Sequence, residues 1–281
     1  MDYITPNTLQ DALELMDQDG YRALATGLSQ SRFGGALDGS LRALVSLRKV
    51  PGLNGVTQSP SEVRVGPSVR YVDLMEHPAI RAIPLLNEAL SEIGEPHVRN
   101  HGSLGGALQS GGLADAPVLA ALMALDAEVI LAGRTGPVQQ SVQSFSRGGL
   151  RVGLPAGRLA VEVVIPVGQW TSCRYLPLER TQGLGPVSGI ALALCEANAL
   201  VGDVRLVVAG FTEQPVRLTT VEAALTGKPL TADSIRQASA AIVSDIESAN
   251  GETVPNAYSL HLITVLIRRV LLASQSATAT S

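Results

Sequence analysis

The sequence has few charged residues and no clusters of one sign, which argues against nucleic acid as a binding partner. Charged residues make up 16% of the 281 residues, and the net charge of −4 is spread without a block of like charges. Neutralising nucleic-acid phosphates requires clustered lysines and arginines, so nucleic acid is not expected as the main partner. Hydrophobic residues make up 46% of the chain, which indicates a folded globular protein.

Cysteine is scarce as well. Only Cys173 and Cys195 are present, and two thiols cannot ligate an iron–sulfur cluster, which usually takes four. The pair could form a disulfide, but both lie in apolar sequence, which favours free buried thiols. The first ten residues lack the basic and apolar regions of a signal peptide, and no apolar run reaches the length of a transmembrane segment. A cytoplasmic protein is therefore expected.

Strand-like and helical patterns alternate over the N-terminal part of the chain and favour a small α/β unit there. An N-terminal α/β subdomain is expected over residues 1–55 and a second α/β subdomain over 56–169. A C-terminal domain of strands followed by helices is expected over 170–281. Its helices are predicted at 231–248 and 257–272, whereas the segment 190–200 fits either a strand or a helix.

One short stretch, Arg99–Gly106, combines a cation, a hydroxyl and three glycines in eight residues. Glycines let a backbone approach a ligand and adopt positive φ, so that exposed N–H groups can form a concave anion site. Such a loop suits a phosphate, although glycine clusters also form plain turns. A second loop of small and polar residues, Ala25–Ser31, follows a predicted buried strand.

Other kinds of site are not predicted. His97 and His101 have the spacing of metal ligands on a helix, but Asn100 and Gly102 argue against a helix there and no third ligand is evident. No catalytic triad, Walker loop or zinc-protease motif is evident either. This fits a protein whose chemistry belongs to a cofactor, with no catalytic side chain of its own.

With both loops in place, the chain resembles the flavin-binding medium subunits of molybdenum hydroxylases, such as those of carbon monoxide, caffeine and nicotine dehydrogenases and the central domain of xanthine dehydrogenase. The family's second loop reads approximately Arg-Asn-x-Gly-Thr-Ile-Gly-Gly-Asn, and here it reads Arg99-Asn100-His101-Gly102-Ser103-Leu104-Gly105-Gly106-Ala107. Its first loop, Ala-Gly-Gly-x-Ser-Leu, is matched by Ala25-Thr26-Gly27-Leu28-Ser29-Gln30. Further matches in family order include Val72-Asp73-Leu74, Leu125-Asp126-Ala127 and Gln214-Pro215-Val216-Arg217.

The resemblance implies an α+β fold, in which two α/β subdomains hold FAD between them and a C-terminal domain with a small antiparallel sheet and helices follows. It assigns cofactor binding to Ala25, Thr26, Gly27, Leu28, Ser29, Gly102, Ser103, Leu104, Gly105, Gly106 and Asp115. The Ser103 hydroxyl would bond a phosphate oxygen, and Asp115 would contact the ribose. As an alternative, Asp115 serves only as the N-cap of the helix that Pro117 opens.

The resemblance also implies an assembly. Substrate would be oxidised at a molybdopterin centre on a large partner subunit, and electrons would cross two [2Fe-2S] clusters on a small partner. They would reach FAD on this chain and pass to an external acceptor. A dimer of heterotrimers is expected.

Two departures from the family pattern leave alternatives open. Thr26 stands where relatives have glycine, and Ala107 replaces an Asn or Asp, which removes a hydrogen bond typically worth about 1 kcal/mol. One alternative is a structural or assembly subunit that has lost flavin, and another is a stand-alone flavoprotein reductase. If the loop binds FAD, Gly105→Val is expected to abolish FAD retention and leave the fold intact.

Overall fold

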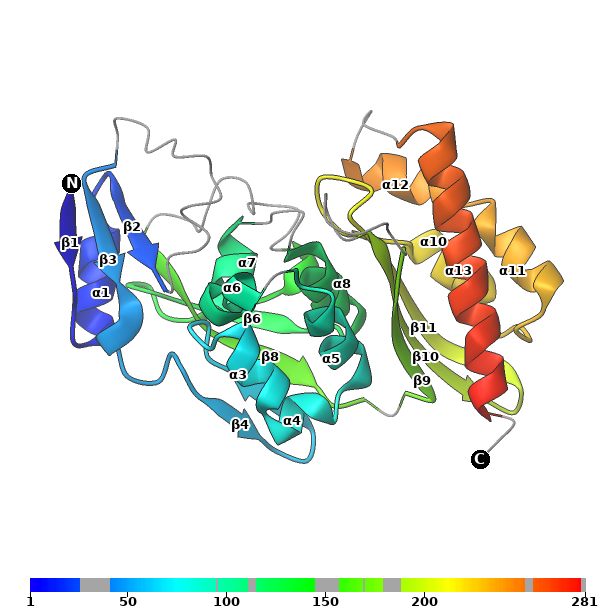
Figure 1. Ribbon diagram of the computed structural model, residues 1–281, viewed down its shortest axis with the longest axis horizontal. Helices are drawn as coiled ribbons and strands as arrows, with labels where there is room; N and C mark the ends of the chain where they lie inside the picture. Colours follow the sequence, from blue (N-terminus) through cyan, green and yellow to red (C-terminus); the bar gives the residue numbers. More distant parts are fainter. Residues whose placement is uncertain are drawn as a thin grey trace. The chain divides into compact units, whose positions relative to one another are not determined.

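The computed structural model describes residues 1–25, 41–94, 96–110, 115–144, 157–168, 170–178, 188–250 and 255–278. The chain forms two compact units, each assembled from separate stretches (Figure 1). The first unit comprises Met1–Ile80, Gly94–Gly111 and Asp126–Val167, and the second comprises Arg81–Ile93, Gly112–Leu125 and Gly168–Ser281. The three-part division at residues 55 and 169 stays a prediction.

The first unit begins with a three-stranded parallel sheet. Its strands are β1 (Asp2–Ile4), β2 (Tyr21–Leu24) and β3 (Ala43–Ser46), with β3 in the centre. Helix α1 (Leu9–Met16) connects β1 to β2 and begins at Thr8, whose hydroxyl accepts the N–H of Asp11 at 3.1 Å. The helix buries its apolar side against Val45 and Leu47, which completes a small hydrophobic core.

A five-stranded antiparallel sheet forms the rest of the first unit's framework. Its order is β4 (Val56–Gln58), β5 (Glu62–Val65), β8 (Arg158–Pro166), β6 (Glu128–Gly133) and β7 (Val138–Ser141). Helical segments in this unit are η1 (Leu47–Lys49), α3 (Tyr71–Glu76), α4 (Pro78–Arg81), α6 (Pro96–His101) and α7 (Leu104–Ser110). The last residue of α4, Arg81, already belongs to the second unit. The valines of β5, Val63 and Val65, are fully buried and alternate with half-buried polar residues, as period-two packing requires.

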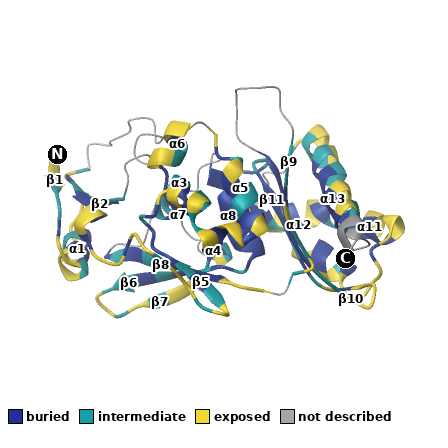
Figure 2. Cartoon of the chain, turned by 60° about the horizontal axis from the view of Figure 1, so that its bottom comes forward, coloured by how far each residue is buried: buried dark blue, intermediate teal, exposed yellow. Residues whose placement is uncertain are grey.

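The second unit is built on a four-stranded antiparallel sheet. Its order is β12 (Val216–Arg217), β11 (Leu200–Ala209), β10 (Gly189–Ala197) and β9 (Ser172–Pro177). The segment that fitted strand or helix is thus a strand, β10. Six consecutive buried residues in β10, 189–194, show that both faces of the sheet are covered (Figure 2).

Helices cover the two faces of this sheet. Helices α5 (Pro84–Ser91) and α8 (Ala116–Ala124) lie on one face (Figure 1). The other face carries α10 (Thr219–Leu225), α11 (Ala232–Ser239), α12 (Ile242–Asn250) and α13 (Ala257–Thr278). All nine residues of α8 are buried, which explains why its sequence is apolar on every side. Pro84 separates two helices, because α4 ends before it and α5 starts there, as suits a residue that cannot donate a backbone hydrogen bond inside a helix.

The single helix predicted over 231–248 is wrong. The structure contains two helices, α11 and α12, separated at Ala240 and Ala241. Ile235 of α11 and Ile246 of α12 are both buried in the same core, so the break lets two short helices contribute to it. Apolar spacing continues across the turn, which is why the pattern reads as one helix.

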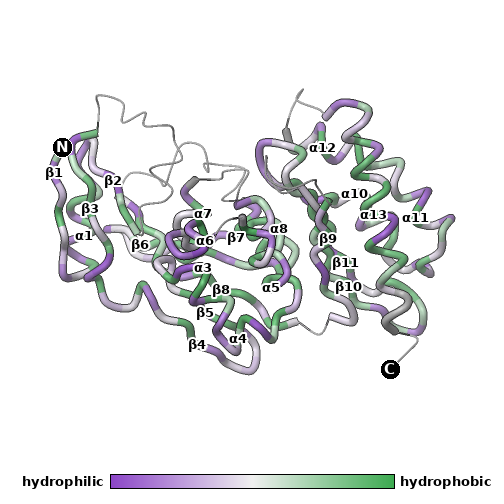
Figure 3. Tube along the Cα trace, in the orientation of Figure 1, coloured by the Kyte–Doolittle hydropathy of each residue, from purple (hydrophilic) through white to green (hydrophobic). Residues whose placement is uncertain are grey.

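Helix α13 corrects the expectation that no segment is long and apolar enough to span a membrane. Its window Ala257–Ser274 meets both criteria by length and composition, with 33% of the window buried. The same helix supplies a stripe of buried residues to the core of the second unit: Ile263, Leu266, Ile267, Val270 and Leu271. Arg268 and Arg269 are exposed between them, and Figure 3 shows hydrophobic and hydrophilic residues mixed along the helix. We therefore assign α13 as a core helix.

A cluster of charged residues joins α5 to β9 in the second unit. The carboxylate of Glu88 accepts the backbone N–H of Tyr175 at 2.7 Å and pairs with Arg174 at 3.0 Å. Burial, followed by the negative charge of Glu88, raises the pKa of Cys173 to about 12. The thiol is therefore protonated at neutral pH, and both cysteines are free, as expected.

Glu92 lies at the C-terminal end of α5, and its burial raises the pKa of its carboxyl group, with a further contribution from Glu88. A raised pKa in the folded state means that stability falls as pH rises above the ordinary value. We expect Glu92→Gln to raise the melting temperature at about pH 7, and this gain should shrink as the pH falls to about 4. Thermal denaturation across this range, with the exposed Glu247→Gln as control, tests the effect. A gain that does not depend on pH would contradict it.

Asp245 of α12 holds the start of α10. Its carboxylate accepts the N–H groups of Thr220 at 2.9 and 3.0 Å and of Val221 at 3.1 Å, and the residue is 6% exposed. Asp245→Ala leaves these donors without their acceptor and should lower the free energy of unfolding by about 2 kcal/mol. Urea denaturation measures this loss, and Glu247→Ala on the exposed side of α12 is the control. Equal stability of the two variants would show that Asp245 does not support α10.

Candidate functional site

The predicted Arg99–Gly106 loop is mostly helical. Helix α6 ends at His101, Gly102 and Ser103 form the connection, and α7 begins at Leu104. The expectation that no helix carries His97 and His101 is therefore wrong, and the Nδ1 atom of His101 lies 2.9 Å from the carbonyl oxygen of His97. Within the described ranges, no group of three His, Cys, Asp or Glu side chains could hold a metal ion.

Two glycines of this segment allow close packing against neighbouring parts of the first unit. A Cβ at Gly102 would lie 2.5 Å from the ring of Tyr71, and a Cβ at Gly105 would lie 2.8 Å from the carbonyl oxygen of Pro67. Neither residue has a positive φ, and the same is true of Gly106. The expected left-handed backbone is therefore absent from these three glycines. Gly102 and Gly105 instead allow α6 and α7 to pack against residues 67–71.

The amide groups of the three glycines bond within the chain. Gly102 donates to the carbonyl oxygen of Val98 at 2.6 Å, and Gly105 donates to that of Pro67 at 2.8 Å. Gly106 donates to the hydroxyl oxygen of Ser103 at 3.2 Å. Ser103 is 1% exposed, and its hydroxyl group can still donate its own proton. Phosphate binding by this segment stays a prediction.

The remaining predicted site residues lie in different parts of the structure. Ala25 follows β2 directly and is half-buried, whereas Thr26, Gly27, Leu28 and Ser29 lie outside the described residues. Asp115 belongs to the second unit, is 4% exposed and stands just before α8. Asp115 occupies the N-cap position of α8, as the alternative expects, although its side chain forms no capping hydrogen bond to this helix. Its contact with the ribose stays a prediction.

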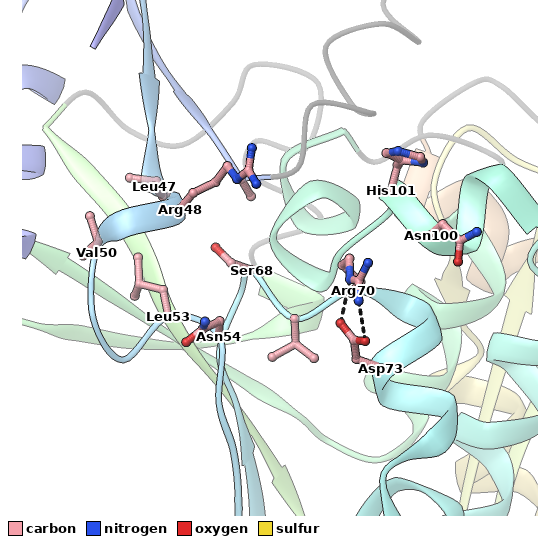
Figure 4. A pocket seen from close by; sticks show the side chains of 12 residues that line it. Leu47, Arg48, Val50, Leu53, Asn54, Ser68, Arg70, Asp73, Asn100 and His101 are labelled. Atoms are coloured by element: carbon pink, nitrogen blue, oxygen red, sulfur yellow. Dashed lines mark hydrogen bonds and ion pairs between the residues drawn. The ribbon is translucent and has the colours of Figure 1, made fainter. Parts of the chain in front are cut away.

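A cavity of about 560 Å³ in the first unit is lined by the described first residue of one predicted loop and by two residues of the other (Figure 4). Its lining includes Ala25 on one side and Asn100 and His101 on the other. Ala25 is the first residue of the first loop, while Asn100 and His101 immediately precede Gly102. The fold therefore brings the beginnings of two loops that are distant in sequence to one cavity, which is within the size range of small-molecule sites.

The lining of the cavity is partly apolar and partly polar. Its apolar residues are Leu47, Val50, Leu53 and Val69, which are almost completely buried. The polar lining residues are Arg48, Asn54, Ser68, Arg70, Asp73, Asn100 and His101. Arg48 and Ser68 each lie within three residues of the end of a strand, β3 and β5 respectively. A cation or hydroxyl just after a buried strand is the sequence signal that could have identified them.

Two lining residues of the cavity, Arg48 and Ser68, suit an anionic ligand, whereas the charge of Arg70 is already paired. Asp73 binds the guanidinium of Arg70 through two 2.7 Å hydrogen bonds and raises its pKa. Arg48 has no ion pair within the described part of the chain. The Oγ atom of Ser68 is buried and has no hydrogen-bond partner among the described residues, and a bound polar group could supply one. These residues fit one part of a dinucleotide.

Comparison with known proteins identifies the chain. Residues 1–168 match the family model described as FAD binding domain in molybdopterin dehydrogenase, and residues 178–274 match that of the CO dehydrogenase flavoprotein C-terminal domain. These matches place the protein in the class of oxidoreductase flavoproteins. Within this class, the chain belongs to the family of FAD-binding medium subunits of molybdenum hydroxylases.

Relatives match over nearly their whole length. The glyceraldehyde dehydrogenase medium chain of Sulfolobus acidocaldarius is 27% identical over 94% of each chain. The nicotine 6-hydroxylase medium subunit of Paenarthrobacter nicotinovorans is 27% identical over 98% of each chain. A solved structure of carbon monoxide dehydrogenase from Hydrogenophaga pseudoflava contains a chain with 25% identity and a TM-score of 0.87, covering 99% of this chain and 98% of that one. The predicted α+β fold is thereby confirmed.

The packing at Gly105 corrects the expectation that Gly105→Val would leave the fold intact. Even the single Cβ of alanine would lie 2.8 Å from the Pro67 oxygen and 2.9 Å from its Cβ, so backbone must shift. We expect Gly105→Ala to lower the free energy of unfolding by about 1–3 kcal/mol. Gly55→Ala is the matched control, because nothing lies within 4 Å of its added Cβ. Urea denaturation compares them, and equal stability would rule out this packing role.

Proposed function

We propose that this chain binds FAD and serves as the electron-transfer subunit of a molybdenum hydroxylase. Electrons would come from [2Fe-2S] clusters on a small partner subunit and leave to an external acceptor, after substrate oxidation at a molybdopterin centre on a large partner. The cavity of the first unit is the observation that carries the proposal, since Ala25 of one predicted loop and His101 of the other line the same ligand-sized space. Relatives named as medium chains and subunits support a multi-subunit assembly.

Within this proposal, the chain's residues bind and orient the cofactor. FAD supplies the redox chemistry, and this chain needs no general acid or base for substrate oxidation. Residues 25–29 and 102–106 would hold the pyrophosphate, and Asp115 would contact the ribose. The buried hydroxyl of Ser103 would donate its proton to a phosphate oxygen, a charge-assisted hydrogen bond that is stronger than a neutral one. We also propose a cytoplasmic location and a dimer of heterotrimers.

A flavin-free structural subunit is the alternative, and two observations favour it. The glycine amides expected to bind phosphate already have acceptors within the chain at Val98, Pro67 and Ser103. In addition, Ala107 is 1% exposed inside α7, where it offers no polar side chain. Flavin content decides between the two proposals.

The visible spectrum of the purified full chain tests FAD binding. We expect a flavin absorption band, and we expect Ser103→Ala to weaken FAD binding about tenfold because a charge-assisted hydrogen bond is lost. Ser103→Thr keeps a hydroxyl group and should restore FAD binding, while the exposed Ser61→Ala should have no effect. A chain without a flavin band, even after incubation with FAD, would support the structural-subunit alternative. Co-purification of a cysteine-rich iron–sulfur protein would exclude the stand-alone reductase.

A further inference from the structure

We propose that the outward face of helix α13 binds the surface of a lipid bilayer that carries anionic headgroups. This face consists of residues that are exposed or half-buried: Tyr258, His261, Leu262, Val265, Arg268 and Arg269. It belongs to the second unit and shares no residue with the cavity of the first unit. The inference concerns where the protein docks, so it goes beyond the proposed function and does not depend on FAD binding.

Helix α13 uses only one of its sides for the core. That side packs against β9, β10 and α11 and includes the buried residues Ile263 and Ile267. The six outward residues follow the spacing i, i+3 or i+4, i+7, and i+10 or i+11, so they lie along the opposite side over roughly 16 Å. Exposed residues recur along α13 in Figure 2. The helix therefore presents a continuous second face outside the core.

The outward face carries apolar side chains that the core does not use. Tyr258 is 71% exposed, and Leu262 and Val265 are half-buried without belonging to the core cluster of the second unit. Tyrosine is enriched at membrane–water interfaces, where its ring lies at the level of the headgroups. Burial of such side chains at the boundary between headgroups and acyl chains supplies part of the binding energy of an interfacial helix.

The charge of this face has a single sign. Arg268 and Arg269 are exposed, and neither has an ion pair among the described residues. No aspartate or glutamate follows Glu252 in the sequence, although the whole chain has a net charge of −4. Cations close to a bilayer are attracted to anionic lipids, and the long arginine side chain lets its charged end reach the headgroups while its stem covers apolar surface.

The neighbouring helix does not cancel this charge. On α11, Asp233 pairs with Arg236 of the same helix at 2.9 Å, so its carboxylate is already compensated. The shape of the face also favours a bilayer over a protein partner. Protein partners bind tightest where large side chains fill a pocket, whereas a bilayer accepts the convex side of a single helix.

Co-sedimentation with lipid vesicles tests the inference. The full chain, purified with any partner subunits that accompany it, is mixed with vesicles of phosphatidylcholine alone or of an equimolar mixture with phosphatidylglycerol. We expect binding to the anionic vesicles that weakens as salt is added, and little binding to phosphatidylcholine. The double variant Arg268→Gln/Arg269→Gln should bind the anionic vesicles about thirtyfold more weakly, which is about fivefold for each cation.

Two further variants separate the outward face from general effects. Arg22→Gln/Arg42→Gln removes the same net charge from exposed positions of the first unit and should bind vesicles like the natural chain. Tyr258→Ser removes the exposed aromatic ring and should weaken binding about threefold. All three variants should melt close to the natural chain, because exposed side chains away from packing contribute little to stability.

Equal vesicle binding by the two double variants would overturn the inference, and so would a natural chain that does not bind anionic vesicles at low salt. Gel filtration covers the remaining occupants of this face. If Arg268→Gln/Arg269→Gln releases a partner subunit or a second copy of the chain, the face is a protein interface and the inference is wrong. Flavin content is measured in parallel and should be the same in all three variants, so this inference and the electron-transfer function can fail separately.

Discussion

The close contact between the Gly102–Gly105 segment and residues 67–71 is the constraint on which the first unit's site depends. Gly105 donates to the Pro67 oxygen at 2.8 Å, and Tyr71 donates to the Gly102 oxygen at 3.0 Å. These bonds form only because neither glycine carries a Cβ, which would overlap Pro67 or the Tyr71 ring. The contact keeps Asn100 and His101 near Ser68 and Arg70, so that all four line one cavity.

Local sequence patterns predicted much of the fold. The helix predicted over 257–272 begins where α13 begins. Short-range chemistry likewise accounts for the Thr8 cap of α1, the start of α5 at Pro84 and the alternating valines of β5. The predictions were wrong or left open where long-range packing determines the secondary structure. The break between α11 and α12 has no proline or glycine to announce it, and β10 could be identified only by its antiparallel neighbours β9 and β11.

The candidate site was only partly predictable for the same reason. A glycine-rich motif reveals that the backbone must approach something closely, but not whether that neighbour is a ligand or the chain itself. Here the described neighbours of Gly102 and Gly105 are Tyr71 and Pro67. Arg48 and Ser68 belong to no recognised sequence motif. They line the same cavity as Ala25 and His101 only because the fold brings the ends of β3 and β5 together there.

These observations change which groups are expected to recognise an anionic ligand. The sequence predicts a cradle of glycine N–H groups, yet those of Gly102, Gly105 and Gly106 bond within the chain. Ala107 is buried in α7, where a polar side chain would itself need a partner, so its replacement of Asn or Asp suits the helix. Among the described residues, side chains are therefore better placed than glycine amides for this task. A hydroxyl or guanidinium can be replaced without disturbing the glycine packing, which allows ligand binding and folding to be separated experimentally.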